Sequence, residues 1–218
     1  MVTQADALSV TTGSLPFVSR GGAKLNDAFD DLEVAVEGRL WLDAGASTGG
    51  FTDRLLQGGA TKVIAADVGY GQLDWTLRND PRVVVLERTN VRNLSPGDLP
   101  FAPDGVVADL SFISLTVVLP ALVRLATPAA DFVLLVKPQF EVGRDKVGKG
   151  GVVRDPDLWR GALASVVEAA AREGLGLAGA TPSRHPGPAG NREFFVHLKA
   201  GASGRGDLLD RAVEDAPR

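Results

Sequence analysis

The sequence of 218 residues contains no cysteine, and this absence sets the first limits on its chemistry. Without cysteine there is no disulfide framework, no thiolate nucleophile and no zinc site with cysteine ligands. The chain also shows no signal peptide, so we expect a protein of the reducing cytoplasm. Its length suits one ordinary α/β domain with a sizeable core.

Long apolar runs and an excess of positive charge are also missing. The stretches "LTVVLPALV" and "DFVLLVKP" are interrupted by proline or charge, whereas a membrane span needs about 20 apolar residues. We therefore expect no membrane contact. The net charge of −4 argues against bulk electrostatic coating of nucleic acid, although a local basic face can still bind phosphates. The composition leaves the oligomeric state open, and a monomer is our working expectation.

What the sequence does contain is a regular alternation of apolar runs and helical patterns. We expect strands at residues 40–44, 63–66, 83–86, 106–108 and 131–137, and a last alternating strand at 193–200. Helical patterns follow several of these runs, and a long helix is expected over 155–174. Strands that are apolar on both faces and alternate with helices indicate a parallel sheet covered on both sides. The fold class is therefore predicted to be α/β.

An amphipathic helix is predicted ahead of the first strand. In "SRGGAKLNDAFDDLEV" the apolar residues Leu25, Ala28, Phe29 and Leu32 recur at helical spacing. The polar positions of this segment fall on the other face of the helix. We expect its apolar face to cover part of the sheet.

The loop "LDAGASTGGF" places an acidic residue and three glycines at the end of the first apolar run. Bare backbone at this point allows close approach of a cofactor, although a tight turn alone would also favour glycine. The loop lacks the lysine of a P-loop, and Gly45, Gly49 and Gly50 depart from the G-x-G-x-x-G spacing of dinucleotide folds. Asp67, at the end of the next run, can accept hydrogen bonds from two ribose hydroxyls. These features favour S-adenosyl-L-methionine, which has no pyrophosphate, with Asp43 positioning its ammonium group.

Two polar residues close the later strands, where ligands bind in an open α/β sheet. Asp109 ends the fourth run and Lys137 ends the fifth. Methyl transfer requires an aligned nucleophile that loses its proton, and Lys137 is placed to orient a hydroxyl and stabilise its charge. The alternatives are a lysine that extends to solvent and a carboxylate that caps the following turn.

Most of the chain, from Phe17 to about Lys199, resembles one known family. The segments that carry the resemblance are "VSRGGAKL", "LDAGASTGGFTD", "AADVGYGQLDWTLRNDPRVVVLERTN", "VADLSFISL", "LVKPQFEVG" and "GNREFF". They are similar to the TlyA (hemolysin A) family of S-adenosylmethionine-dependent 2′-O-ribose rRNA methyltransferases, within the FtsJ-like group. The resemblance implies a Rossmann-like class I methyltransferase fold, with a mostly parallel seven-stranded sheet, helices on both faces and an antiparallel last strand.

The resemblance also implies the reaction and its residues. The substrate would be the ribose 2′-hydroxyl of cytidines in ribosomal RNA, in the small subunit and in some members also the large. The implied catalytic set is Lys24, Asp109, Lys137 and Glu193. The implied cofactor residues are Asp43, Gly45, Ala46, Ser47, Thr48, Gly49, Gly50, Phe51, Asp67, Val68, Glu87, Arg88, Thr89, Asn90 and Asp109.

Basic residues near the expected site are candidates for contact with RNA phosphates. The glycine-rich segment "KPQFEVGRDKVGKGGVVR" provides most of them, although an ordinary solvated loop has the same composition. The candidates are Arg20, Arg144, Lys146, Lys149 and Arg154, with Arg78, Arg88 and Arg92 as further possibilities. His185 and His197 have no second ligand at metal spacing, so no metal site is expected, and His197 is expected on the surface of the last strand.

The family resemblance also suggests how the chain is divided. Members usually begin with a small S4-type RNA-binding domain, and residues 1–16 are interpreted as a linker or remnant of it. Residues 17–200 are expected to form the methyltransferase domain, and residues 201–218 a tail or short helix.

Two other classes of function remain open from the sequence. An N-methyltransferase commonly carries Asp/Asn-Pro-Pro-Tyr after the fourth strand, whereas this chain has "DLSF", in which Phe112 keeps an aromatic ring. A non-catalytic RNA-binding remnant or a membrane-damaging protein is the other alternative. No segment combines a dense Lys/Arg face with a Trp/Phe/Leu face, so direct lysis has little physical support.

Overall fold

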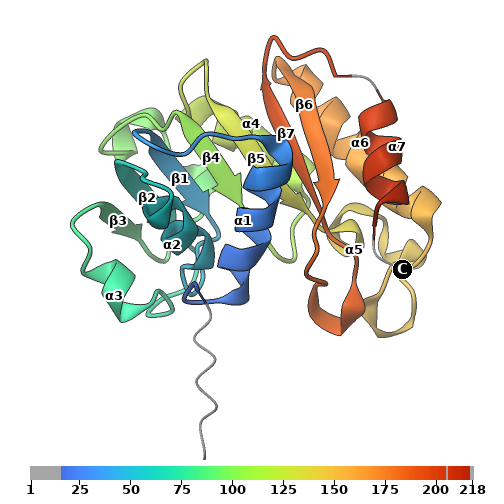
Figure 1. Ribbon diagram of the computed structural model, residues 1–218, viewed down its shortest axis with the longest axis horizontal. Coiled ribbons are helices and arrows are strands. Elements are labelled where there is room, and N and C mark those ends of the chain that lie inside the picture. Colours follow the sequence, from blue (N-terminus) through green and yellow to red (C-terminus); the bar gives the residue numbers. More distant parts are fainter. Residues whose placement is uncertain (1–15, 205, 217–218) are drawn as a thin grey trace, which may run out of the picture.

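Within residues 16–204 and 206–216, which the computed structural model describes, seven strands form one sheet (Figure 1). The strands are β1 (Leu40–Ala44), β2 (Lys62–Ala66), β3 (Val83–Leu86), β4 (Gly105–Ala108), β5 (Asp131–Val136), β6 (Leu175–Pro182) and β7 (Phe194–Ala200). Their order is β3-β2-β1-β4-β5-β7-β6. β1 to β5 are parallel, and β7 runs antiparallel to both β5 and β6. The predicted mostly parallel sheet with an antiparallel last strand is confirmed.

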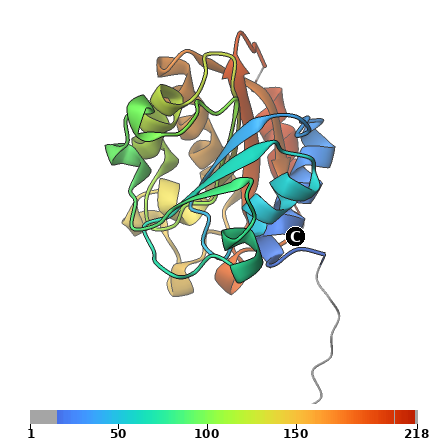
Figure 2. The same ribbon diagram turned by 90° about the vertical axis from the view of Figure 1, so that its left-hand side faces the viewer.

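Helices cover both faces of the sheet (Figure 2). They are α1 (Arg20–Leu32), α2 (Gly50–Gln57), α3 (Trp75–Arg78), α4 (Leu115–Leu125), α5 (Pro138–Glu141), α6 (Pro156–Arg172) and α7 (Asp207–Glu214). Short 3₁₀ turns are η1 (Val91–Asn93), η2 (Pro96–Asp98), η3 (Arg144–Lys146), η4 (Lys149–Gly151) and η5 (Pro188–Gly190). One core packs α4, α6 and α7 against the sheet, and a second core packs α1 and α2 on the opposite face.

The strand β6 is the element with the weakest sequence signal. Its sequence, "LGLAGATP", is dominated by small residues, and a bulge lies between Leu177 and Gly179 in its pairing with β7. Side-chain alternation is therefore poorly visible, since glycine and alanine add little contrast between the two faces. The strand nevertheless extends the sheet beyond β7 and gives α7 a surface on which to pack.

The first turns of α1 and α2 are in direct contact, and glycine is what permits it. A Cβ atom on Gly22 would lie 2.9 Å from the carbonyl oxygen of Gly50. A Cβ on Gly50 would lie 2.7 Å from the backbone nitrogen of Gly22. Both distances are too short for a side chain, so the "GG" pairs of the two segments let the helices approach. This contact brings α1, and with it Lys24, beside the first loop of the sheet.

His197 lies in the protein interior, and the expectation of a surface position was wrong. The residue is 7% exposed, and its Nε2 lies 2.6 Å from Asp131 Oδ1. The other oxygen of Asp131 lies 2.8 Å from a guanidinium nitrogen of Arg39. The reason is topological, because β7 is enclosed between β5 and β6 instead of forming an edge.

Two further expectations concern the ends of the chain. The linker predicted for residues 1–16 lies outside the described residues except for Pro16. At the other end α7 packs against α6 and β6. No helix in the described part of the chain is long and apolar enough to cross a membrane.

We expect Asp131→Asn to lower the free energy of unfolding near neutral pH by about 1–3 kcal/mol, because it weakens two partly buried polar contacts. Burial alone would raise the pKa of Asp131, but hydrogen bonds from His197 and Arg39 outweigh it and lower the pKa. The stabilisation is therefore present above the ordinary carboxyl pKa and is lost as pH falls through the lowered value. Urea unfolding at several pH values measures it, with the exposed Asp145→Asn as the control. A difference that grows on acidification would contradict this account.

Candidate functional site

A cavity of about 480 Å³ opens where β1, β2 and β4 end. Seven of the predicted cofactor residues line it: Gly45, Ser47, Asp67, Val68, Thr89, Asn90 and Asp109. Gln72, Leu110, Ser111, Phe112 and Ile113 complete much of the remaining wall. The strand ends therefore converge as the sequence predicts, on the edge where ligands bind in open α/β sheets.

The loop after β1 is built so that backbone, not side chain, faces the end of β4. Gly45 has φ +87°, and a Cβ atom on it would lie 2.6 Å from the carbonyl oxygen of Asp109. Gly49 has φ +98°, and a Cβ there would strike Leu77 at 2.3 Å. Ser47 adopts φ +48° without being glycine. Such strained backbone persists where surrounding structure fixes it, which is common at ligand sites.

Asp67 fixes this loop through its carboxylate. One oxygen accepts a hydrogen bond from the backbone of Ser47 at 2.8 Å, and the other accepts from the backbone of Gly69 at 2.6 Å. A carboxylate has about four acceptor positions, so two remain for hydroxyl donors of a ligand. Asp67 also lines the cavity, so those positions lie beside it.

Asp43 lies below the loop and is completely buried. Thr52 donates its hydroxyl hydrogen to Oδ2 at 2.7 Å, while Oδ1 has no hydrogen-bond partner among the described residues. Burial raises the pKa of Asp43 to about 7, Thr52 opposes the increase, and the charges of Asp109 and Asp67 add to it. A cation held among these carboxylates would lower that pKa again. An unpartnered buried oxygen is thus consistent with a site for an ammonium group.

Lys137 and Asp109 form a close ion pair at the ends of β5 and β4. The Lys137 Nζ lies 2.5 Å from Asp109 Oδ1, in an ion pair without hydrogen-bond geometry at that oxygen. Nζ also donates to the hydroxyl of Ser111 at 3.0 Å. Lys137 is 8% exposed, so the lysine does not extend to solvent, and Asp109 is paired instead of capping a helix.

Lys24 and Glu193 form a second, more deeply buried pair. Lys24 Nζ donates to Glu193 Oε2 at 2.6 Å, and the Glu193 side chain is completely inaccessible. Glu193 Oε1 has no hydrogen-bond partner among the described residues, and Gly187 lies so close to it that a Cβ would be 2.1 Å away. Val136 of β5 pairs with Phe194 of β7, so Lys137 and Glu193 occupy the next positions in register. The two ion pairs therefore lie on the same edge of the sheet.

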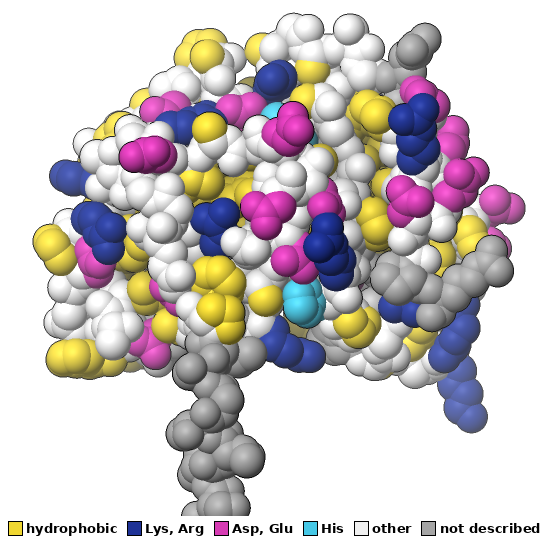
Figure 3. All heavy atoms as spheres, in the orientation of Figure 1, with side chains coloured by type: hydrophobic (Ala, Val, Ile, Leu, Met, Phe, Trp, Pro, Cys, Tyr) yellow, Lys and Arg dark blue, Asp and Glu magenta, His cyan; other side chains and the backbone are white. Residues whose placement is uncertain are grey.

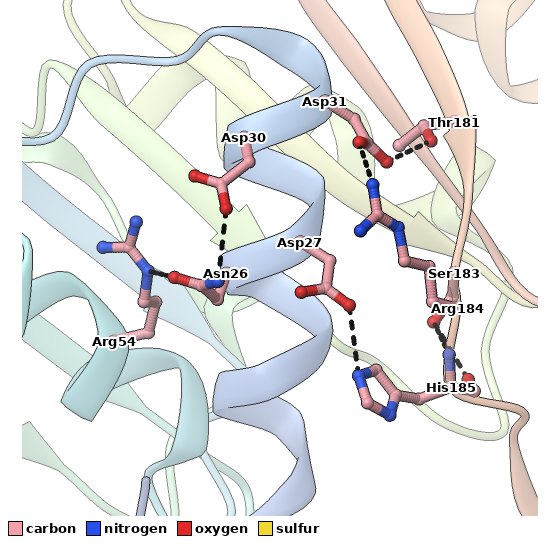
Figure 4. Close-up of polar contacts among 9 residues, drawn as sticks. All are labelled: Asn26, Asp27, Asp30, Asp31, Arg54, Thr181, Ser183, Arg184 and His185. Atoms are coloured by element: carbon pink, nitrogen blue, oxygen red, sulfur yellow. Dashed lines mark hydrogen bonds and ion pairs between the residues drawn. The ribbon is translucent and has the colours of Figure 1, made fainter. Parts of the chain in front are cut away.

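A row of polar contacts fixes α1 against the segment that leads to Glu193 (Figure 4). Asp27, one turn beyond Lys24, lies 3.2 Å from the imidazole of His185. Asp31 accepts a hydrogen bond from Thr181 at 2.9 Å and pairs with Arg184. The backbone N–H of Ser183 donates to the carbonyl of Glu193 at 2.8 Å. The helix of Lys24 and the strand of Glu193 are thereby held together.

Phe112 is the exposed aromatic residue of the cavity wall. The residue is 91% exposed and its φ is +63°, which is uncommon for a bulky residue. Its ring centroid lies 5.2 Å from that of Phe140. The ring is two residues beyond Leu110 and follows Ser111, which contacts Lys137. The arrangement offers a flat apolar surface beside the ion pair of Lys137 and Asp109.

The predicted basic residues are distributed unevenly. Arg20, Arg144, Lys146, Lys149 and Arg154 are exposed. Arg78 pairs with Glu87, and the guanidinium of Arg88 lies 4.2 Å above the ring of Tyr70. Figure 3 shows basic side chains interspersed with acidic ones on the face it presents, not one continuous basic area. Phosphate binding would therefore depend on a few local groups.

Some predicted cofactor residues do not line the cavity. Phe51 is buried, with its ring 6.0 Å from that of Phe195, and Gly50 packs against α1. Thr52 and Ser111 were not predicted, although they contact Asp43 and Lys137 directly. Hydroxyl residues are common at helix starts and turns, so the sequence carried no distinct signal for them. No cluster of three His, Asp or Glu suited to a metal ion occurs in the described part of the chain.

Comparison with known proteins agrees with this geometry. Residues 17–200 match the family model for FtsJ-like methyltransferases. The 16S/23S rRNA (cytidine-2′-O)-methyltransferase TlyA of Mycobacterium tuberculosis is 53% identical, over 99% of this chain and 83% of that protein. A crystal structure of a hemolysin candidate from Lactococcus lactis has a TM-score of 0.85 at 40% identity, covering 91% of this chain and 99% of that one. An S-adenosylmethionine-dependent methyltransferase from Mesorhizobium loti shares the fold at 15% identity, with TM-score 0.59 and coverage of 83% and 99%.

We expect Asp43→Asn to stabilise the ligand-free protein at about pH 8 and to do so less at about pH 5. The pKa of Asp43 is raised from 3.8 to about 7, so its contribution to stability is present below the lower value and lost as pH rises through the higher one. Each pKa unit corresponds to about 1.4 kcal/mol, so the free energy of unfolding should change by at most a few kcal/mol. Thermal unfolding at both pH values measures it. An equal change at the two pH values, or a larger gain at acidic pH, would contradict the assignment.

Proposed function

This chain belongs to the FtsJ-like methyltransferase family, and we propose that it methylates the ribose 2′-hydroxyl of cytidines in ribosomal RNA. The observation that supports it most strongly is the placement of two lysine–carboxylate pairs, both with a buried lysine, on the edge of the sheet that carries the glycine-walled cavity. The catalytic unit is residues 17–200, acting on ribosomal subunits in the cytoplasm. The named activity of the 53% identical relative supports the same substrate class.

The methyl donor is S-adenosyl-L-methionine, and the residues present suit it. When bound, it supplies an electrophilic methyl group on a sulfonium. The loop around Gly45 would hold it through backbone, because side-chain atoms are excluded there. Asp67 has acceptor positions left for its ribose hydroxyls, and the unpartnered oxygen of Asp43 suits its ammonium group, directly or through water. The loop sequence lacks the lysine of a P-loop, which agrees with a ligand that has no phosphate.

Lys137 is the group proposed to act on the attacking oxygen. Methyl transfer would form a bond from this oxygen to the methyl carbon while the carbon–sulfur bond of the donor breaks and leaves a neutral thioether. The hydroxyl loses its proton in the same step, so negative charge develops on its oxygen. An ammonium group at Nζ can donate a hydrogen bond to it, and the low exposure of Lys137 strengthens the interaction. Asp109 and Ser111 hold Nζ in place.

Lys24 and Glu193 extend the electrostatic environment of the same edge. With Lys137 and Asp109 they make a set of two cations and two anions, which has no net charge before a substrate arrives. The departing proton is therefore assigned to this set of groups and not to one named residue. Glu193 is inaccessible, and its role is to orient and hold Lys24.

Phe112 is proposed to stack on the base of the target nucleotide. A ribose hydroxyl reaches a recessed site when its nucleotide turns out of the surrounding RNA structure. The exposed ring of Phe112, beside the ion pair of Lys137 and Asp109, can then receive the base. The N-methyltransferase alternative has less support, because Leu110 and Ser111 follow Asp109 at the end of β4, where that motif has its two prolines.

Replacing Lys137 with methionine is expected to lower the rate of methyl transfer to ribosomal subunits by about 100-fold or more. The affinity for S-adenosyl-L-methionine, measured by calorimetry, should change by less than about threefold, because Lys137 is not one of the residues proposed to bind the cofactor. A threefold change in affinity corresponds to well under about 1.4 kcal/mol, the free energy of a tenfold change. Lys62→Met, an exposed lysine at the start of β2, is the matched control. Retention of more than about a tenth of the activity would remove Lys137 from this role.

The product itself tests the proposed reaction. Methylated subunits are digested to nucleosides, and the methyl group is located by mass spectrometry on the ribose or on the base. We expect 2′-O-methylcytidine. A methyl group on the base would establish the N-methyltransferase alternative instead.

Phe112→Ala is expected to reduce methyl transfer by about tenfold or more, in line with stacking energies of about 1–3 kcal/mol per base. Phe112→Trp should restore most of the activity, since it keeps a flat ring. Val117→Ala removes another exposed apolar side chain, close to Phe112 in the sequence, and serves as the control. If alanine and tryptophan variants are equally impaired, stacking is not what Phe112 provides.

A further inference from the structure

A second cavity of about 720 Å³ lies beside the edge of the sheet that carries the two lysine–carboxylate pairs. We call this edge the catalytic edge and the cavity the flank cavity. One wall comes from the segment 152–154 and the start of α6, and another comes from Ala189, Gly190 and Arg192. The end of α7 closes the third side with Val213, Glu214 and Ala216. Its volume lies within the range of about 300–1,000 Å³ that is typical of ligand pockets. None of the catalytic or cofactor roles proposed above uses it.

The walls of the flank cavity are fixed by side-chain hydrogen bonds. The Asn191 amide oxygen accepts from the backbone of Val153 at 3.1 Å, and its nitrogen donates to the carbonyl of Gly151 at 2.9 Å. The Trp159 indole donates to the carbonyl of Val153 at 2.9 Å, and its ring packs 5.9 Å from Phe194. Two segments far apart in sequence are thereby joined. The cavity is a formed feature of the fold.

Both walls continue directly into the site described above. Arg192 immediately precedes Glu193, the partner of Lys24. The opposite wall, residues 152–154, is the end of a segment that begins at Lys137. This segment also contains the exposed residues Arg144, Lys146 and Lys149. A ligand of the flank cavity would therefore be a neighbour of the molecule held at the catalytic edge.

The charges of the flank cavity suit an anionic ligand. Arg154 and Arg192 line it, and neither forms an ion pair or side-chain hydrogen bond with any other described residue. Glu214 is the acidic residue among those lining the cavity. Asp155, next to Arg154, is engaged as the cap of α6, where it accepts a hydrogen bond from the backbone of Asp157 at 2.9 Å. Two guanidinium groups are thus left to bind anions.

The apolar part of the lining narrows the class of ligand. Val152, Trp159 and Val213 provide surface that a free inorganic anion would not use. A nucleotide presents both a phosphate for arginine and a flat apolar face for packing. We propose that the flank cavity binds a single-stranded RNA nucleotide that neighbours the methylated cytidine. This inference rests on the proposed function, since it assigns a second contact to the same substrate.

Charge reversal of the two arginines tests the proposal through RNA binding, independently of catalysis. Arg154→Glu/Arg192→Glu is expected to weaken binding of a ribosomal RNA fragment by at least about tenfold and to reduce the salt dependence by about two phosphate contacts. Affinity for S-adenosyl-L-methionine should stay near that of the wild type and reports intact folding. Arg172→Glu, at the far end of α6 and about 24 Å away along the helix, is the matched control.

A variant with the opposite effect guards against a folding defect. Glu214→Arg removes the acidic residue of the lining and is expected to tighten RNA binding by about threefold or more, because it adds a phosphate partner. Glu168→Arg on the exposed side of α6 makes the same change of charge away from the cavity. The proposal is supported if Glu214→Arg strengthens binding beyond this control.

Three results would overturn the proposal. The first is equal weakening by Arg172→Glu, which would show bulk electrostatics only. The second is unchanged RNA binding in the double variant. The third is a loss seen with whole subunits but not with protein-free RNA, which would assign the flank cavity to a ribosomal protein. A wild-type chain that binds RNA through these residues without methylating it would instead reject the proposed function.

Discussion

The site depends on cations that are buried only because carboxylates accompany them. Lys137 and Lys24 are both nearly inaccessible, and each has a carboxylate oxygen within 2.6 Å or less of its ammonium nitrogen. An unpaired buried charge would be costly, so each pair must form together with the fold. The parallel order of β4 and β5 and the antiparallel return of β7 bring Asp109, Lys137 and Glu193 to one edge, and the contact of α1 with α2 adds Lys24. The catalytic arrangement therefore depends on strand order and on the packing of α1.

Asp43, unlike the two buried lysines, has no partner of opposite charge in the described part of the chain. It is buried without a cation, and its raised pKa of about 7 records the cost of ionising it there. A bound ammonium group would offset that cost, so the ligand-free protein carries a destabilising feature that its cofactor relieves. The glycines of the adjacent loop follow the same logic, since they give up side-chain contacts to expose backbone.

The sequence predicted those features that depend on local pattern. Strand ends at Asp67, Asp109 and Lys137 could be read from the alternation of apolar runs with helical segments, and the resemblance supplied Lys24 and Glu193. Their pairing could not be read from spacing, because 169 residues separate the two. His197 was misplaced because alternation in a terminal strand does not tell whether another strand covers it. The role of Asn191 depends on contacts with a distant loop, which no local pattern reveals.

Whether the two pairs act as one unit is tested most directly by a double-mutant cycle on the methyl-transfer rate, using Lys137→Met, Glu193→Gln and their combination. Because all four groups share one electrostatic environment, the combined variant should be about as slow as the slower single variant. Cofactor affinity is measured in parallel to confirm that the three proteins fold. Losses that multiply would show that Lys137 and Glu193 act independently, and would contradict the central role of the paired, buried charges.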